Sequence, residues 1–167
     1  MTHAVSDGPA GVGVLLETLR LWQEMGFRPR RTILISLWSG GYLSRSGADT
    51  FREELTPYAG LEQRAVLHLG SIGAGDERLL ASGTGGPLDD LIDGGCGQMG
   101  IPLETGLAPQ HAYEKELAQL SSRIAWAEAP NPYDAGTAQD TLDPERLEQI
   151  GNLVTYLLTS ASRQIYF

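Results

Sequence analysis

The spacing of apolar residues predicts two long helices, one near each end of the chain. Between Asp7 and Gly26 apolar residues recur every three to four positions, as in a helix that buries one face. Asp7 is an expected N-cap and Gly26 an expected stop. Asp143 and Pro144 open the last helix in the same way. The predicted buried stripes are Val12, Leu15, Leu16, Leu19 and Trp22 in the first helix, and Leu147, Ile150, Val154, Leu157, Leu158 and Ala161 in the last.

Apolar runs between these helices predict strands. Residues 32–38 form a near-continuous apolar run that is typical of a strand covered on both faces. Residues 65–69 predict a second buried strand, and residues 123–127 predict a further strand. Residues 78–81 predict a short edge strand. Further helices are expected at residues 46–55, 87–93 and 112–120. Strands that alternate with helices predict an α/β protein: a three-layer α/β/α sandwich with a mostly parallel mixed sheet, formed by residues 1–167 as one domain.

Charge and hydropathy exclude several classes of function. The net charge of −9 lacks the basic stripe that nucleic acid requires, and it disfavours an anionic membrane surface. No apolar run approaches the ~20 residues that span a bilayer. The first residues also lack the basic and apolar regions of a signal peptide. The chain is therefore expected in the cytoplasm if it is complete, and outside it if it is part of a secreted precursor.

Few residues offer chemistry on their own. Cys96 is the single cysteine, which excludes an intrachain disulfide and a cysteine-based zinc site, and an inert thiol is expected. His68 lies in a predicted strand, where a core histidine is expected rather than a ligand. His3 lies in a terminus that is expected to fray, and His111 stands in a polar loop and has no partner at the spacing of a metal motif. No phosphate loop or serine nucleophile motif occurs.

Six short segments, however, follow one another in the order of the motifs of a known protein family. They are Ala-Val-Ser-Asp-Gly-Pro-Ala-Gly at 4–11, Leu-Leu-Glu at 15–17, Arg-Pro-Arg-Arg-Thr-Ile at 28–33, Ser-Gly-Gly-Tyr-Leu-Ser-Arg-Ser-Gly-Ala at 39–48, Leu-His-Leu-Gly-Ser-Ile-Gly at 67–73 and Gly-Thr-Ala-Gln-Asp-Thr at 136–141. This order resembles the co-catalytic zinc aminopeptidases of peptidase family M twenty-eight. The resemblance implies a zinc-aminopeptidase-like sandwich that lacks the N-terminal strands of the family.

The resemblance also implies that the metal site is degenerate. In the family, carboxylates and imidazoles hold two zinc ions beside a glutamate base. Asp7 matches the bridging ligand, although a helix cap is the preferred interpretation of this residue. The general base falls on Gly41. The remaining ligand positions that the chain contains fall on Tyr42, Gly70 and Gly136. A shifted alignment does not restore the base, because no Asp or Glu occurs in residues 32–48.

These substitutions predict a non-catalytic, peptidase-like domain without a cofactor. Inactive members of the family act as receptor or recognition subunits, so the resemblance implies a protein-binding or structural role. A protein partner or a homo-oligomer is expected, because missing strands leave a sheet edge open. The alternative is a zinc aminopeptidase whose active site is completed by a missing N-terminal segment or by a partner chain. A decayed gene copy without a selected role is the third hypothesis.

Overall fold

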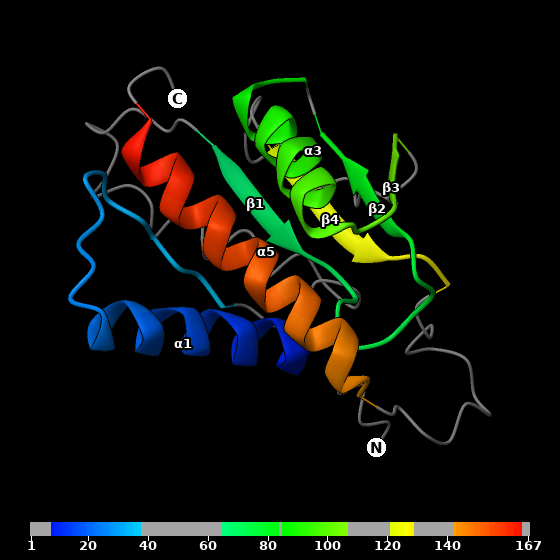
Figure 1. The fold of residues 1–167 in the computed structure, drawn as a ribbon, viewed down its shortest axis with the longest axis horizontal. Coiled ribbons are helices and arrows are strands. Elements are labelled where there is room, and N and C mark those ends of the chain that lie inside the picture. Colours follow the sequence, from blue (N-terminus) through cyan, green and yellow to red (C-terminus); the bar gives the residue numbers. More distant parts are fainter. Residues whose placement is uncertain (1–7, 38–64, 84, 107–120, 129–141, 165–167) are drawn as a thin grey trace.

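The computed structural model describes residues 8–37, 65–83, 85–106, 121–128 and 142–164 (Figure 1). Its elements, in chain order, are α1 (Gly8–Glu24), β1 (Val66–Leu69), β2 (Leu79–Ser82), α3 (Pro87–Met99), β3 (Leu103–Thr105), β4 (Ser121–Trp126) and α5 (Pro144–Arg163). The predicted helices at 46–55 and 112–120 lie outside the described residues. No helix in the described ranges has the length and hydropathy to cross a membrane.

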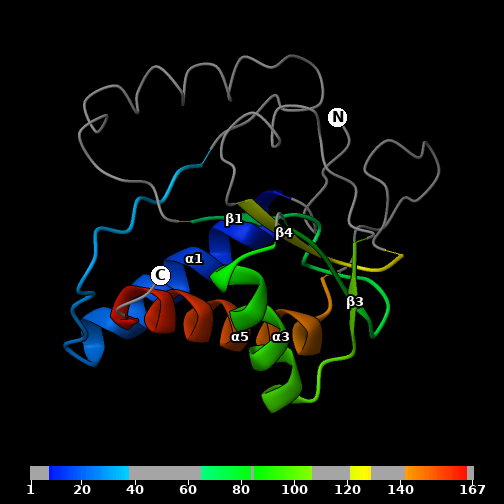
Figure 2. The ribbon, with the colours of Figure 1, turned by 90° about the horizontal axis from the view of Figure 1, so that it is seen from above.

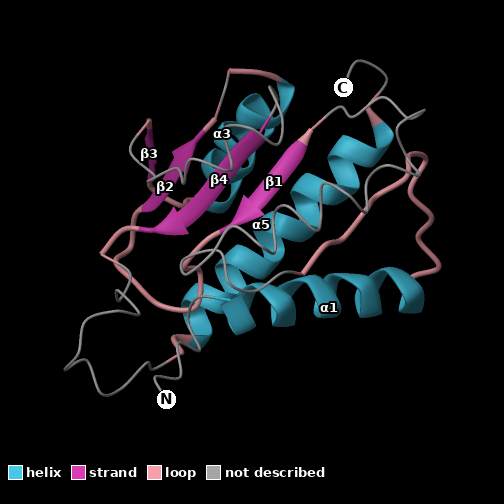
Figure 3. Cartoon of the chain, turned by 180° about the vertical axis from the view of Figure 1, so that it is seen from behind, coloured by secondary structure: helices cyan, strands magenta, loops and turns pink. Residues whose placement is uncertain are grey.

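The strands form one mixed sheet in the order β1-β4-β2-β3 (Figure 3). β1 pairs with β4 in parallel, and β2 pairs with β3 in parallel. β2 and β4 are antiparallel. β4 is central, and its residues from Ser122 onward are buried because strands flank it on both edges. The predicted α/β class and mostly parallel mixed sheet are therefore confirmed.

The helices α3 and α5 cover one face of this sheet, and α1 packs against α5 (Figures 1 and 2). α5 begins as predicted: the Asp143 carboxylate accepts hydrogen bonds from Glu145 N at 2.9 Å and Arg146 N at 3.2 Å. Most of its predicted stripe is confirmed. The fully buried residues of α5 are Ile150, Leu153, Val154 and Leu157. They pack in one core with Ile124 and Trp126 of β4.

The predicted stripe of α1 is partly wrong. Leu16 and Leu19 are 57% and 41% exposed, whereas Thr18 is 1% exposed. The buried side chains of α1 form a row of residues spaced four apart, namely Ala10, Val14, Thr18 and Trp22, and α1 packs against α5. The pattern of apolar residues did not predict the burial of Thr18, because a threonine is usually buried only where its hydroxyl group is hydrogen-bonded.

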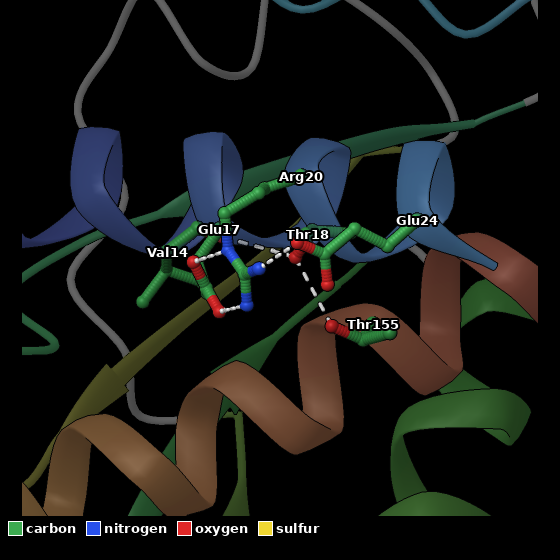
Figure 4. Close-up of polar contacts among 6 residues, drawn as sticks. All are labelled: Val14, Glu17, Thr18, Arg20, Glu24 and Thr155. Carbon is green, nitrogen blue, oxygen red and sulfur yellow. Dashed lines mark hydrogen bonds and ion pairs between the residues drawn. The ribbon is translucent and has the colours of Figure 1, made fainter.

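Hydrogen bonds between α1 and α5 explain this burial. Thr18 Oγ1 donates to Val14 O at 2.9 Å and lies 3.0 Å from Thr155 Oγ1 (Figure 4). One turn later, Trp22 Nε1 donates to Thr159 Oγ1 at 3.1 Å. We call these two pairs the threonine seam. On α1, Arg20 forms exposed ion pairs with Glu17 and Glu24 (Figure 4). Exposed ion pairs of this kind contribute little stability. The threonine seam and the buried row of α1 therefore hold this helix in place.

Two predicted strands differ in the structure. Residues 32–37 form no strand, because no described strand lies against them to share ladder hydrogen bonds, and Leu34 and Leu37 are 49% and 55% exposed. The predicted edge strand at 78–81 is instead the internal strand β2. Its outer neighbour is β3, a strand that the sequence did not predict.

The glycine-rich helix α3 is longer than the predicted 87–93. It continues through Gly94, Gly95 and Gly97 and stops at Gly100, whose φ of 67° provides a left-handed cap. Gly95 lies against α5: a Cβ atom on it would be 2.8 Å from Leu153 Cδ1 and 3.0 Å from Tyr156 Cδ1. A Cβ atom on Gly94 would meet no atom within 4 Å. Of Gly94 and Gly95, only Gly95 therefore allows the close packing of α3 against α5.

Alanine substitutions at Gly94 and Gly95 should change the free energy of unfolding in opposite directions. Gly94→Ala should stabilise the protein by about 0.5–1 kcal/mol, because glycine is a poor helix former. Gly95→Ala should destabilise it, because overpacking costs about 1–3 kcal/mol and outweighs that gain. Urea unfolding of both variants provides the measurement. Equal stabilisation by the two would contradict the close approach of α3 and α5.

Candidate functional site

Three polar residues form a row across the middle of the sheet. The register of β1 and β4 pairs His68 with Arg123, and that of β4 and β2 pairs Arg123 with Ser82. Paired residues share a face, and neighbours along a strand alternate. Because Ile124 and Leu69 pack into the core beneath α3 and α5, this row lies on the opposite face of the sheet. We call it the polar row.

Arg123 is the most unusual member of the polar row. It is only 8% exposed, although it lies in the centre of the sheet. Its guanidinium group packs onto Gly70, which directly follows β1 and donates a backbone hydrogen bond to Ile124 O at 2.9 Å. A Cβ atom on Gly70 would lie 2.8 Å from Arg123 Nη2 and 3.0 Å from Nε. The guanidinium therefore fills the space into which a side chain at position 70 would extend.

Gly70 is the one assigned metal-ligand position that the structure describes. Zinc sites use thiolate, imidazole or carboxylate ligands. A guanidinium offers no acceptor and carries a positive charge, so the residues at Gly70 do not fit a zinc ion. Across the described ranges, no group of three or more His, Cys, Asp or Glu residues is placed to hold a metal ion. The other assigned positions, Asp7, Gly41, Tyr42 and Gly136, lie outside the described residues, as do His3 and His111.

A second polar cluster joins the start of α3 to β4. The Asp89 carboxylate accepts hydrogen bonds from Ser122 Oγ and, at 2.8 Å, from Gly85 N. Gly83 passes so close that a Cβ atom on it would be 2.0 Å from Asp89 Oδ1. A carboxylate in the first turn of a helix is also favoured by the helix dipole. Sequence reasoning missed Asp89, although an acid just after Gly86-Pro87 is the usual signal of a helix start. These contacts assign it a structural role.

Cys96 is buried in α3 at 1% exposure. Burial raises the pKa of its thiol to about 11, and the nearby Asp93 carboxylate adds to the shift. A thiol with a raised pKa is a poor nucleophile near neutral pH. The burial agrees with the inert thiol that the sequence predicts.

One surface hollow of the described residues lies between α1, α5 and the end of α3. Its volume is about 660 Å³. The residues that line it are uncharged: Leu21, Met99, Ile101, Gln149, Asn152, Thr155, Tyr156, Thr159 and Ser160. These lining residues offer no carboxylate, imidazole or thiol for acid–base or metal chemistry, so this hollow is not the candidate site.

Comparison with known proteins gives the same fold as the sequence resemblance. The chain is similar to the crystal structure of BSAP, a zinc aminopeptidase from Bacillus subtilis, with a TM-score of 0.66 and 17% sequence identity. The match covers 93% of this chain and 42% of that chain. The zinc-aminopeptidase-like fold is therefore confirmed. The loss of the metal ligands stays a prediction.

A second similarity is to human transferrin receptor protein 2. The two sequences are 30% identical over 128 residues, which is 75% of this chain and 16% of the receptor. The chain thus spans about a sixth of the receptor and less than half of the aminopeptidase. No family model matches the chain.

The thiol of Cys96 should resist alkylation in the folded protein. At pH 8 we expect iodoacetamide to react roughly 100-fold more slowly than with the urea-unfolded chain, because little thiolate forms. Stability should also fall as pH rises from about 8.5, the usual thiol pKa, because the unfolded thiol loses its proton more readily than the folded one. Mass spectrometry of timed samples measures the first effect. Equal rates in both states would contradict the burial of Cys96.

Proposed function

We propose that this chain is a single, non-catalytic aminopeptidase-like domain that acts as a protein-binding or structural subunit. The observation that carries the proposal is the Arg123 guanidinium packed onto Gly70. A hydrolytic zinc ion requires acceptor ligands and a base beside its bound water. At this position the chain presents a buried guanidinium, whose positive charge would repel a zinc ion held nearby.

The resemblance of the remaining positions supports the same conclusion. Gly41, in place of the general base, accepts no proton, and Tyr42 and Gly136 replace two ligands. Without ligands no water is polarised, and without a base no proton is removed from it. The similarity to a protein named as a receptor agrees with a role in binding. A fold carries function only through its site, and here the assigned site lacks its chemistry.

The second candidate function is a zinc aminopeptidase completed by another segment or chain. The likeness to a zinc aminopeptidase, of which this chain spans 42%, favours it. The two hypotheses differ in zinc content per chain.

Purified protein equilibrated with zinc should contain no stoichiometric metal and should cleave no aminoacyl substrate. Metal analysis after gel filtration and a chromogenic aminoacyl amide assay provide the measurements. The Asp7→Ala variant is the control, because Asp7 is the one position that matches a ligand. One or more zinc ions per chain that are lost in Asp7→Ala would overturn the proposal.

Substitutions at position 70 should reveal the neighbouring charge. Both Gly70→Asp and Gly70→Asn must displace the guanidinium, but only Asp offers it a carboxylate. Gly70→Asp should therefore be more stable than Gly70→Asn by roughly 1–3 kcal/mol, the usual contribution of a charge-assisted hydrogen bond. The difference should vanish in an Arg123→Met background. A Gly70→Asp variant that binds zinc instead of pairing with Arg123 would count against a non-catalytic role.

A further inference from the structure

The outward face of α5, opposite its buried stripe, carries a regular row of residues. Six of them are spaced alternately four and three positions apart, namely Glu145, Gln149, Asn152, Tyr156, Thr159 and Arg163. This is the heptad spacing, which keeps the residues on one stripe of a helix and through which helices pack in coiled coils. None of the six is buried, and Glu145, Asn152 and Arg163 are exposed. We call these six residues the heptad row.

The heptad row lies along the surface hollow between α1 and α3. Its four middle residues line this hollow. Leu21 of α1 and Met99 of α3 line the two flanks, because α1 and α3 lie on opposite sides of α5 (Figure 1). The flanks therefore present apolar side chains, and the middle of the row between them is polar but uncharged. A second helix laid along the row would contact both flanks.

Charge occurs only at the two ends of the heptad row. Glu145 begins the row and Arg163 ends it, at equal distances from its midpoint. Among the described residues, neither side chain forms an ion pair within the chain. The Arg163 guanidinium lies 4.8 Å from the ring centroid of Phe27, and a guanidinium stacked on a ring keeps its N–H donors at the edge available. The row thus offers one acceptor end and one donor end.

We infer that two copies of this chain pair through the heptad row, with their α5 helices antiparallel about a two-fold axis. This inference rests on the proposed protein-binding role and names its surface and partner. An axis at the midpoint of the row pairs residues of one copy with residues of the other, namely Glu145 with Arg163, Gln149 with Thr159, and Asn152 with Tyr156. Each charged end then meets its opposite, at both ends of the interface. A two-fold interface requires such self-complementarity.

The charge of the whole chain favours this surface for contact between copies. The net charge is −9, so two copies repel each other where acidic surfaces meet. At physiological salt, charges more than about 8 Å apart are largely screened, so the charges at the contact itself decide. The heptad row has no net charge, and the antiparallel arrangement places no like charges opposite each other. A foreign helix would need charged ends at the same spacing, whereas a second copy supplies them by symmetry.

Analytical ultracentrifugation of the full chain tests this inference. We expect a reversible equilibrium between monomer and dimer. Glu145→Arg and Arg163→Glu each place like charges opposite each other at both ends of the interface. Each should raise the dissociation constant of the dimer roughly tenfold or more. The double variant Glu145→Arg/Arg163→Glu restores opposite charges, so its dissociation constant should return to within about threefold of that of the unaltered chain.

Glu104→Arg is the matched control. It changes the net charge by the same amount as Glu145→Arg, but Glu104 lies on β3, an edge strand of the sheet, and not on α5. Its side chain is 40% exposed and pairs with Arg78, and an exposed pair of this kind contributes little stability. Glu104→Arg should therefore leave the dissociation constant unchanged. Circular dichroism verifies that each variant is folded.

Several outcomes would overturn the inference. A chain that stays monomeric up to about 1 mM does not pair through this surface. A dimer that is unaffected by both reversals uses another surface, and equal weakening by Glu104→Arg indicates a general effect of charge. A double variant that is no tighter than the single variants shows that the two ends do not face each other. None of these results involves zinc, so the metal analysis tests the non-catalytic role separately.

Discussion

Burial of one face of α5 is the constraint on which the described structure depends. Four of its residues are fully buried, and the same helix contacts α3, α1 and the core side of β4. Each fully buried leucine or isoleucine contributes about 1.5–3 kcal/mol relative to an exposed one. α3 lies close enough that its Gly95 has no room for a methyl group beside Leu153. The position of α5 therefore determines where both other described helices lie.

Local sequence patterns predicted the elements that depend least on their neighbours. α5 carries its own cap at Asp143 and its own apolar stripe, and both were recognisable. β1 and most of β4 were recognisable from the apolar residues of 65–69 and 123–127. Residues 32–37 have the same pattern but form no strand, because ladder hydrogen bonds come from another segment and not from composition. Thr18 was missed for a related reason: its burial depends on Thr155, which is far away in the sequence.

The sequence predicted the position of the candidate site, but it did not predict which side chain occupies that position. The resemblance pointed to Gly70 but gave no indication that Arg123 would fill the space beside it, because that contact joins two strands distant in the sequence. One signal was available. An arginine at the start of the predicted strand 123–127 is unusual, because buried charges require specific surroundings. A charged residue within a predicted buried strand is thus a useful marker of a specialised site.

The threonine seam has a consequence for the order in which the protein acquires its structure. Both of its hydrogen bonds join residues 137 positions apart, between the first described helix and the last. During synthesis α1 leaves the ribosome first, but the surface that satisfies Thr18 and Trp22 emerges only with α5. Until then α1 is a short amphipathic helix of marginal stability. Closing so long a loop is slow, so the nascent chain must keep this buried row of α1 from aggregating until α5 has been synthesised.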